Sequence, residues 1–340
     1  MKHLLDMPPD DVAAELASLG EPGYRARQVL AWVWRRGATD FASMTDLPAG
    51  LRQRLADRLA ILTGRVTRRT DSADGVVKLL VEWPDRRHVE TVLIPAGARR
   101  TACLSTQVGC PVGCAFCASG IGGLERDLTA GEIVEQIFHL QAVSQDRVTH
   151  VVVMGMGEPL LNYDATVAAV RAMVDPARAG ISARRVTVST VGLPKQIRRL
   201  AREDLPITLA ISLHAPSDAL RRELIPAARD VPLEQLIQAA SDFFARRHRE
   251  VTLEYVLLAG VNDTADCAAQ LAAIARRLRC NVNLIRFNPV PGVDFRPPDE
   301  RDVRGFRDRL RRAGVNVHVR ASRGADADAA CGQLRIGQRT

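Results

Sequence analysis

From residue 101 onward, the chain alternates short β-branched runs with amphipathic helical segments. This alternation is typical of parallel strands joined by helical crossovers, so it restricts the chain to an α/β fold. Six or seven such units in about 230 residues are too few for a closed eight-stranded barrel, and we predict a partial (β/α)6 barrel. We expect strands at residues 102–107, 150–154, 185–189, 207–213, 251–258, 282–287 and 315–320, and helices that begin near Thr129, Tyr163, Pro194, Pro232, Asp263 and Asp299.

The first hundred residues follow two other patterns. Residues 1–60 contain three short amphipathic segments, two of which end at Gly20 and Gly37 while the third follows Pro48, and this predicts a small helical domain. Residues 61–100 change to alternation with period two, which predicts a short β extension or linker. We therefore expect three units, with the barrel and a functional C-terminal segment over residues 101–340. In such a barrel the ligand site lies beyond the carboxyl ends of the strands.

Composition and charge narrow the class of protein. With 46% hydrophobic and 25% charged residues, the chain is neither disordered, nor fibrous, nor a disulfide scaffold. The N-terminus reaches Asp6 before any apolar segment develops, and no window approaches the roughly eighteen apolar residues of a membrane span. We expect a cytoplasmic protein without a membrane partner, whose cysteines serve metal binding or catalysis. The net charge of +8 permits a polyanionic partner without requiring one.

The strongest chemical signal is the segment Cys110-Pro-Val-Gly-Cys114-Ala-Phe-Cys117, between the first expected strand and the helix that begins near Thr129. Tetrahedral zinc needs four protein ligands, and no second Cys-x-x-Cys or His-x-x-x-His pair follows. A four-iron cluster that is held by three cysteines instead leaves one iron open to an exogenous ligand. The spacing therefore favours a [4Fe–4S] cluster on Cys110, Cys114 and Cys117, with structural zinc as the alternative.

At these residues the sequence resembles the radical S-adenosylmethionine (SAM) superfamily, whose cluster motif has this spacing and an aromatic residue, here Phe116, before the last cysteine. The resemblance extends to residues 155–159, Gly-Met-Gly-Glu-Pro, which are similar to the superfamily's Gly-Glu segment that meets the methionyl amino group. Alone this segment is a weak signal, because glycines at a strand end commonly only form turns. Its place one βα unit after the cysteines supports the resemblance.

Over nearly all of its length the chain resembles one branch, the methyltransferases that act on carbon 2 of adenine in 23S ribosomal RNA and in transfer RNA. Segments 88–91, 103–110, 188–190, 212–215, 287–289 and 323–334 carry this resemblance. It implies SAM, as methyl donor and radical source, as the second cofactor. Matched motif by motif, it implies that SAM contacts Gly157, Glu158, Ser189, Ser212, Leu213, His214 and Asn288. These residues follow expected strands, where a ligand is expected in this fold.

The resemblance also implies roles for three further residues in these segments, Glu90, Cys103 and Cys331. Carbon 2 of adenine is electron-poor and its hydrogen is weakly acidic, so a radical route is the physical solution. In the implied mechanism Cys331 accepts a methyl group from one SAM, and a second SAM supplies the radical that activates it. The methylene radical joins Cys331 to the RNA, Glu90 accepts the carbon-2 proton, and Cys103 releases the product by forming a transient disulfide with Cys331.

The residues alone leave other interpretations open. Cys103 also fits a buried strand thiol, Cys331 an ordered loop thiol and Glu90 a solvent-facing strand residue. The related resistance enzyme that methylates carbon 8 of the same rRNA adenine shares these cysteines. A non-enzymatic, metal-containing RNA-binding protein would have no use for Cys103 and Cys331, and a radical enzyme acting on protein or a metabolite would not explain the basic C-terminal stretch.

The expected partners are 23S rRNA, tRNA and a reducing electron donor such as flavodoxin or ferredoxin, and we expect a monomer. A large RNA must be held by its backbone, and the target base must leave its stack to reach a barrel mouth. One set of candidates for the backbone contacts lies on the second expected helix: Arg25, Arg27, Arg35 and Arg36. The other is the basic stretch 301–340, whose arginines include Arg301, Arg304, Arg307, Arg309, Arg311 and Arg312. These six also fit the solvent-exposed face of a single helix that binds nothing.

Overall fold

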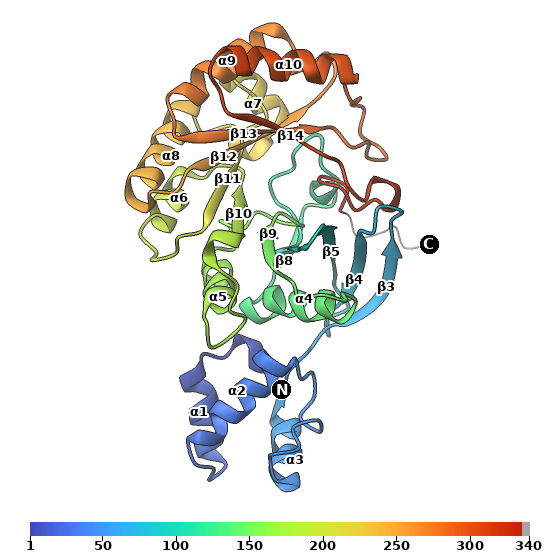
Figure 1. Cartoon of the computed structure of the whole chain (residues 1–340), viewed down its shortest axis with the longest axis vertical. Helices are drawn as coiled ribbons and strands as arrows, with labels where there is room; N and C mark the ends of the chain where they lie inside the picture. Colours follow the sequence, from blue (N-terminus) through green and yellow to red (C-terminus); the bar gives the residue numbers. More distant parts are fainter. Residues whose placement is uncertain (335–340) are drawn as a thin grey trace.

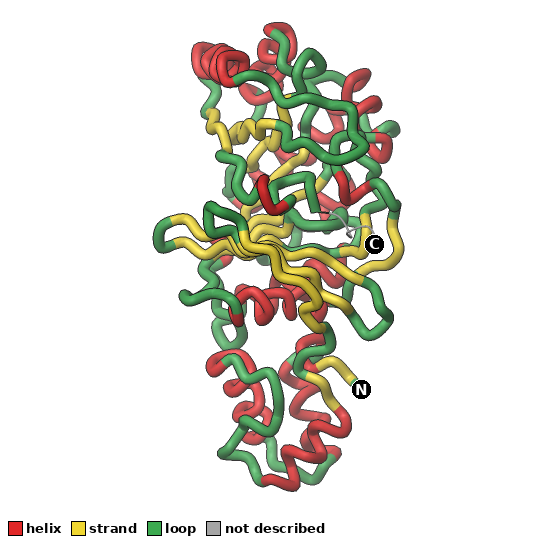
Figure 2. Tube along the Cα trace, turned by 90° about the vertical axis from the view of Figure 1, so that its right-hand side faces the viewer, coloured by secondary structure: helices red, strands yellow, loops and turns green. Residues whose placement is uncertain are grey.

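The computed structural model describes residues 1–334, and one ten-stranded sheet organises most of them (Figures 1 and 2). The strand order is β14-β13-β12-β11-β10-β9-β6-β5-β4-β3. From β6 to β14, all neighbouring pairs are parallel. These strands are β6 (Arg99–Cys103), β9 (His150–Val153), β10 (Val186–Thr190), β11 (Thr208–Ser212), β12 (Val251–Leu257), β13 (Cys280–Arg286) and β14 (Val317–Arg320).

Helices connect these strands and lie on the outside of the curved sheet (Figure 1). They are α4 (Ala130–Ala142), α5 (Tyr163–Val174), α6 (Pro194–Leu200), α7 (Asp218–Leu224), α8 (Leu233–Arg247), α9 (Ala265–Arg276) and α10 (Glu300–Arg312), with the short 3-10 turns η3 (Ala183–Arg185) and η4 (Pro226–Ala228). Among the described residues the sheet ends at β14 on one side and β3 on the other, so the barrel is open. The predicted partial (β/α)6 barrel is confirmed. The strand expected at residues 315–320 is β14, which follows the sixth helical crossover, and α7 is a helix that the prediction lacked.

The helix after the first barrel strand begins where its sequence predicts. The Thr129 side chain accepts a hydrogen bond from the backbone N–H of Glu132 (3.1 Å), and the Glu132 carboxylate accepts one from the N–H of Thr129 (2.9 Å). This reciprocal capping box satisfies two backbone donors that a helix start leaves free. The four residues 129–132 are therefore sufficient to predict where this helix begins.

The expected β extension forms the edge of the barrel sheet. It consists of β3 (Arg65–Asp71), β4 (Val77–Glu82) and β5 (His88–Ala96), which pair antiparallel with one another, while β5 pairs antiparallel with β6. Two further short strands, β7 (Gln107–Gly109) and β8 (Leu124–Asp127), form a hairpin that brackets the cysteine segment. The extension is thus continuous with the barrel, and the division at residues 60 and 100 stays a prediction.

The N-terminal unit lies below the barrel in Figure 1 and contains the three expected helices. They are α1 (Pro9–Ser18), α2 (Tyr24–Arg36) and α3 (Ala49–Arg58), and the short strands β1 (Lys2–His3) and β2 (Leu59–Ala60) pair beside them. Gly37 ends α2 with a φ of 69°, a left-handed conformation that favours glycine. Trp34 packs edge-on against Phe138 of α4 at 5.6 Å between ring centres, which joins this unit to the barrel.

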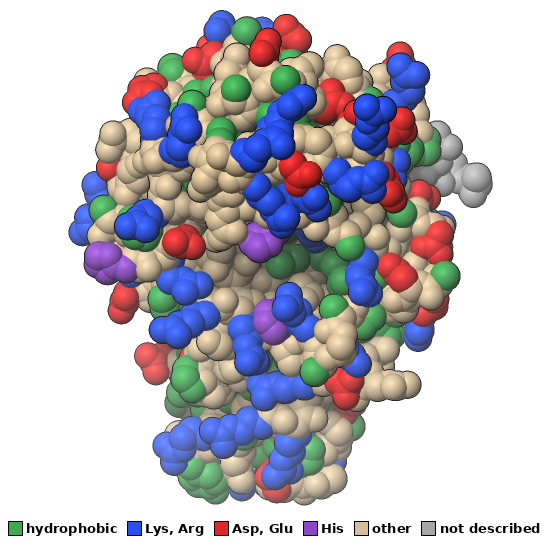
Figure 3. All heavy atoms as spheres, turned by 45° about the horizontal axis from the view of Figure 1, so that its top comes forward, with side chains coloured by type: hydrophobic (Ala, Val, Ile, Leu, Met, Phe, Trp, Pro, Cys, Tyr) green, Lys and Arg blue, Asp and Glu red, His purple; other side chains and the backbone are tan. Residues whose placement is uncertain are grey.

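The surface carries an uneven distribution of charge. Figure 3 shows a hollow in the middle of one face, with Lys and Arg side chains gathered on both sides of it. No helix within residues 1–334 combines the length and apolar character that crossing a bilayer requires.

A buried ionic cluster also ties the N-terminal unit to α4. The His3 ring contacts the Glu135 carboxylate at 3.1 Å and Asp6 of the turn η1 (Leu4–Asp6) at 3.5 Å. Glu135 also accepts hydrogen bonds from the backbone of Thr63 and Gly64 at the connection to β3. Burial lowers the pKa of His3, but the contacts of its ring with the Asp6 and Glu135 carboxylates outweigh this effect and raise the pKa to about 9.

This cluster predicts a pH-dependent stability. A histidine whose pKa rises from 6.5 to about 9 on folding contributes its full stabilisation below pH 6.5 and loses it as the pH rises through 9. We expect the free energy of unfolding, from urea denaturation, to fall by up to about 3 kcal/mol over this window relative to the His3→Gln variant. His318→Gln, at an exposed position of β14, is the matched control. A wild-type pH profile parallel to that of His3→Gln would contradict the assignment.

Candidate active site

The three clustered cysteines lie in one loop at the carboxyl ends of the barrel strands. They line a cavity of about 160 Å³ together with Val153 and Ser212, the last residues of β9 and β11. Backbone hydrogen bonds hold the loop at three points: Cys110 N–H to Gly123 O (2.9 Å), Ala115 N–H to Leu224 O (3.0 Å) and Ala118 N–H to Gly332 O (2.8 Å). Each point joins the loop to a different part of the chain, so tertiary contacts position the thiols.

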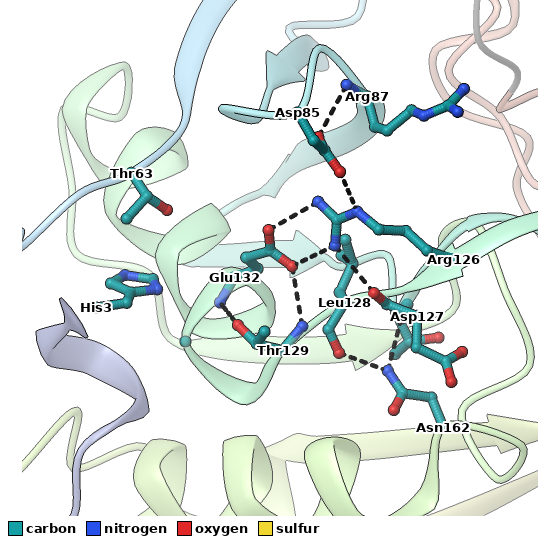
Figure 4. A network of polar contacts seen from close by, with 12 residues as sticks. His3, Thr63, Asp85, Arg87, Arg126, Asp127, Leu128, Thr129, Glu132 and Asn162 are labelled. Carbon is teal, nitrogen blue, oxygen red and sulfur yellow. Dashed lines mark hydrogen bonds and ion pairs between the residues drawn. The ribbon is translucent and has the colours of Figure 1, made fainter. Parts of the chain in front are cut away.

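A polar network fixes the far end of the same loop (Figure 4). Arg126 of β8 binds both oxygens of the Glu132 carboxylate at 2.8 Å and contacts Asp85, in the turn between β4 and β5, at 2.5 Å. A bidentate guanidinium–carboxylate pair has a defined geometry, which restricts the orientation of β8 relative to α4. The Asn162 amide donates to the carbonyls of Thr106 (2.8 Å) and Leu128 (2.7 Å) and closes the network at the start of α5.

The donor set fits an iron–sulfur cluster. Burial raises the pKa of the Cys110 thiol to about 11 and that of Cys114 well above its ordinary value, and the neighbouring thiols add to both effects. Buried thiolates in such proximity require the positive charge of a metal centre. Within residues 1–334 no three His, Cys, Asp or Glu side chains are placed to hold a single ion. A cubane cluster offers a separate iron to each thiolate, so it accommodates ligands that one ion cannot hold.

Glu158 and Gly157 lie beside the cysteines in the same cavity. The Glu158 carboxylate accepts hydrogen bonds from the backbone N–H groups of Val191 (2.6 Å) and Leu160 (3.0 Å). Burial, opposed by the Val191 bond, raises the pKa of Glu158 to about 7. A cationic ammonium group placed here would favour the ionised carboxylate. Gly157 has a φ of 105°, and a Cβ there would meet Gln107 at 2.7 Å, so both conformation and space require glycine.

Ser189, Ser212 and His214 complete this cavity from the next two strands. The two serine hydroxyls lie 3.3 Å apart. Burial and the Arg221 charge lower the pKa of His214 to about 3, so its ring is neutral. Its Nδ1 accepts the backbone N–H of Val256 (3.0 Å), which leaves Nε2 as the donor that the ring offers to a ligand.

The side chains of two other residues expected to contact SAM, Leu213 and Asn288, do not line this cavity. The Leu213 side chain is buried in the apolar core, and its backbone N–H donates to Glu254 O (3.0 Å). The Asn288 amide donates to the carbonyl of Cys331 (3.0 Å) and lines a second cavity. Among the described residues, neither side chain lines the cavity of the cysteines, although the neighbouring residues His214 and Phe287 do.

The second cavity has a volume of about 400 Å³ and extends through the barrel from the amino ends of the strands toward their carboxyl ends. Its lining includes His150 and Thr208, the first residues of β9 and β11, and also Cys103, the last residue of β6, and Asn288, which follows β13. Cys331 and Arg320 line both cavities. Burial and the proximity of Cys331 raise the pKa of the Cys103 thiol to about 12, while Arg320 lowers it. The structure therefore brings Cys103 and Cys331, both free thiols, to one cationic side chain.

The segment that carries Cys331 is held from several directions. Lys78 of β4 donates to Asp328 O (2.9 Å), and the Ser119 hydroxyl of the turn η2 (Ala118–Gly120) donates to Leu334 O (2.7 Å). The Asp326 carboxylate, in the turn η5 (Ala325–Ala327), binds the Ser72 hydroxyl and the backbone N–H of Ala73. These contacts place a C-terminal loop between the edge strands and the cysteine loop.

Glu90 lies near this segment but lines neither cavity described above. It is 4% exposed on β5, and its carboxylate pairs with the Lys78 ammonium at 3.0 Å. The alternative of a solvent-facing strand glutamate is thus wrong, because β5 lies between two other strands and the C-terminal segment contributes to the cover on this side. Lys78 links Glu90 to the carbonyl of Asp328.

Sequence reasoning missed three polar residues that line these cavities. Glu254 and Arg320 line both, and Asn283 lines the larger one. The Asn283 amide donates to the buried Glu254 carboxylate (2.8 Å), and burial raises the pKa of Glu254. Ser212, Glu254 and Asn283 are register partners on neighbouring strands. Polar residues at alternate positions of otherwise apolar strands were the available signal, since alternate residues face the same side of a sheet.

Comparisons with known proteins agree with this geometry. Residues 104–269 match the radical SAM superfamily, and residues 2–61 match the ribosomal RNA large subunit methyltransferase N-terminal domain. A probable dual-specificity RNA methyltransferase RlmN from Rhodopirellula baltica is 44% identical over 98% of this chain and 90% of its own length. The chain belongs to the RlmN family of radical SAM methyltransferases.

Other members of the RlmN family support the same relationship. The probable dual-specificity RNA methyltransferase RlmN of Thermus thermophilus is 43% identical over 99% of this chain and 94% of its own. The crystal structure of a radical SAM methyltransferase from Sphaerobacter thermophilus superposes with a TM-score of 0.96 at 44% identity, covering 98% of this chain and 99% of the other. The family uses a [4Fe–4S] cluster and SAM, which confirms the expected cofactors and makes the non-enzymatic alternative wrong.

Proposed function

We propose that this protein uses SAM to methylate carbon 2 of an adenine in 23S rRNA, at the peptidyl-transferase centre, and of the adenine 3′ of the anticodon in tRNA. The observation that carries this proposal is the position of Cys331, which lines both the cavity of the cluster cysteines and the cavity of Cys103. A thiol that carries a methyl group from donor to RNA needs access to both sides. We further propose that the protein acts as a cytoplasmic monomer with a flavodoxin- or ferredoxin-type electron donor.

The smaller cavity supports the assignment of the cofactor sites. Cys110, Cys114 and Cys117 would hold the cluster, which supplies the electron that makes bound SAM a radical source. Glu158 would accept hydrogen bonds from the ammonium group of SAM, and the neutral His214 ring would donate one from Nε2. The serine hydroxyls of Ser189 and Ser212 supply further polar contacts, whereas Leu213 and Asn288 would act through their backbones or from the larger cavity.

Arg320 supports the roles of the two cysteines outside the cluster. Methyl acceptance by Cys331, and attack by Cys103 on the sulfur of the Cys331 adduct, both require thiolates. The two thiols lie near one guanidinium, and Cys331 is the largest influence that raises the pKa of Arg320. A buried cation stabilises a neighbouring thiolate. We infer that Arg320 serves both sulfur steps in turn.

The Lys78 pair supports Glu90 as the proton acceptor. A carboxylate accepts a proton only in its ionised form, and the ammonium at 3.0 Å favours that form. Because Lys78 also binds the carbonyl of Asp328, the base and the Cys331 segment share one anchor. Displacement of this lysine contact by the RNA adduct would expose Glu90 toward carbon 2.

The larger cavity supports an RNA substrate whose target base is extruded. Its volume of about 400 Å³ lies in the range of ligand sites, and an extruded adenine needs a pocket of this size. Besides Arg320, four arginines line this cavity. Arg99, Arg184 and Arg185 are exposed, and Arg323 is half-buried. They lie where phosphates flanking the base would be held.

The arginines of α2 that are candidates for RNA binding differ in how many contacts they make within the protein. Arg25 is engaged by Glu21, Gln28 and the carbonyl of Asp46, whereas Arg27 and Arg35 are exposed. Arg36 stacks on Trp32 at 4.2 Å. The basic stretch continues into residues 335–340, which lie outside the described residues.

These positions predict which arginines bind RNA. The double variant Arg99→Gln/Arg185→Gln is expected to weaken binding of an anticodon stem-loop about tenfold and to reduce the salt slope of log K by about one to two. The matched variant Arg27→Gln/Arg35→Gln, which removes the same charge from α2, is expected to change the stem-loop affinity less. Fluorescence anisotropy at several salt concentrations measures both. If only the α2 variant weakened binding, the backbone contacts would belong to the N-terminal unit.

The function itself is tested by product analysis. The cluster-reconstituted protein is incubated anaerobically with methyl-deuterated SAM, a reductant and a 23S rRNA fragment or tRNA, and the nucleosides are analysed by mass spectrometry. We expect 2-methyladenosine with two deuteriums, because one hydrogen of the transferred methyl group is removed to make it reactive. A product of 8-methyladenosine would identify the carbon-8 resistance enzyme instead, and no methylated adenosine from either RNA would overturn the substrate assignment.

A further inference from the structure

Arg221 of α7 is a buried cation without sufficient partners. It is 1% exposed, and one of its nitrogens, Nη2, donates to the carbonyl of Val191. Within residues 1–334, its Nε and Nη1 atoms are buried and have no hydrogen-bond partner. Burying a guanidinium in this way is costly unless negative charge lies close by. The hydrogen bond to the carbonyl of Val191 engages one nitrogen and does not balance this charge.

The surroundings of Arg221 lead to the cysteine loop. Leu224, on the same helix, accepts the N–H of Ala115 (3.0 Å), and it packs in one apolar cluster with Val112 and Phe116. The helix α7 therefore covers the loop directly. Around Cys114, burial and the neighbouring cysteines raise the thiol's pKa, and the Arg221 charge opposes them.

The acidic groups near Arg221 are already engaged. Asp218, one turn earlier on α7, accepts the backbone N–H of Leu233 (2.8 Å). The Glu158 carboxylate accepts the N–H of Val191, the residue whose carbonyl binds Arg221. Among the described residues, no carboxylate oxygen lies within 4.0 Å of the guanidinium; burial lowers the pKa of Arg221 to about 10, while the charges of Cys114 and Asp218 raise it. The Arg221 charge thus lies close to Cys114, one of the three cysteines whose thiolates would carry the family's cluster.

We propose that Arg221 is a positioning residue whose charge stabilises the reduced form of the cluster held by Cys110, Cys114 and Cys117, and so raises its reduction potential. Reduction adds one electron, from an external reductant, to a centre in which three thiolates already contribute negative charge. In a buried site of low dielectric, a fixed cation stabilises the more negative state more strongly. The proposal rests on the family's cluster and not on which base is methylated, so its failure and that of the proposed function are separable.

The test is a redox titration of the cluster in the full-length, reconstituted protein without RNA. Dithionite and mediators set the potential, and the EPR signal of the reduced cluster reports the reduced fraction. Arg221→Gln removes the charge and keeps an amide donor for Val191, whereas Arg221→Lys keeps the charge. Arg222→Gln, at the exposed next position of α7, is the matched control.

At the potential where half of the wild-type cluster is reduced, we expect Arg221→Gln to lower the ratio of reduced to oxidised cluster about tenfold, which is 59 mV for a one-electron couple. Arg221→Lys and Arg222→Gln are expected to stay near wild type. The proposal is overturned if Arg221→Gln binds full iron with an unchanged midpoint potential, or if Arg221→Lys shifts it as far as Arg221→Gln. Should glutamine prevent cluster assembly, Arg221→Met is titrated in its place and judged by the same results.

Discussion

Replacing Cys331 with alanine is expected to abolish RNA methylation, with a loss of more than about a thousandfold, because the thiol is the proposed carrier of the methyl group. The contacts that place this residue use its backbone: the Cys331 carbonyl accepts from Asn288, and the neighbouring Gly332 carbonyl accepts from Ala118. The substitution therefore removes the nucleophile and leaves its segment in place. Mass spectrometry of the intact wild-type protein is expected to show one added methyl group, and the variant none.

A second thiol provides the control for this result. Cys267 is half-buried on α9 and packs against the barrel core, outside the lining of both cavities. Cys267→Ala is expected to retain methylation and the methyl label. If Cys331→Ala kept more than about one tenth of the wild-type rate, Cys331 would not be the methyl carrier, and its position between the two cavities would no longer support the proposed function.

Replacing Cys103 with alanine is expected to stop the reaction at a covalent adduct between the protein and RNA. Cys103 lines the larger cavity with Cys331, and the nearby Cys331 contributes to the raised pKa of Cys103. Without the resolving thiol, the bond from the Cys331 sulfur to the RNA persists. Denaturing gel electrophoresis with labelled RNA is expected to show a slow-migrating, protease-sensitive band in place of released product.

The adduct identifies its own attachment site. The double variant Cys103→Ala/Cys331→Ala is expected to form no such band, since the attachment sulfur is absent. Cys280→Ala, a thiol at the start of β13 whose Sγ contacts Ala275 O, is expected to release product normally. A Cys103→Ala protein that turns over like wild type would remove this residue from the mechanism, and an adduct that survives in the double variant would place the attachment on another residue.

Local sequence predicts much of the scaffold. The barrel strands follow β-branched runs, because such side chains favour the pleated, buried surface of a sheet. The capping box of Thr129 and Glu132 and the left-handed Gly37 are chemical requirements of single turns, so four residues suffice to locate them. The short helix α7 escaped prediction because its seven residues, which include Arg221 and Arg222, show no clear apolar stripe.

Some features of the site could also be predicted from local sequence, whereas others depend on the fold. The cysteine spacing predicts the cluster, since the motif needs only nearby residues and a loop. The closeness of Cys103 and Cys331 came from resemblance alone, and in the fold it depends on Lys78, Asp326 and Ser119, which hold the C-terminal segment from distant parts of the chain. The burial of Glu90 likewise depends on its strand neighbours.

Taken by itself, the sequence determined the alternation of strands and helices, the cluster motif and its family, because these depend on periodicity and short spacing. Only the tertiary structure decided that Cys331 lies between two cavities, that Arg320 and Glu254 line both, and that two buried nitrogens of Arg221 have no hydrogen-bond partner within residues 1–334. The reason is physical: hydrogen bonding, burial and charge pairing depend on neighbours in space, and these neighbours are supplied by segments far apart along the chain.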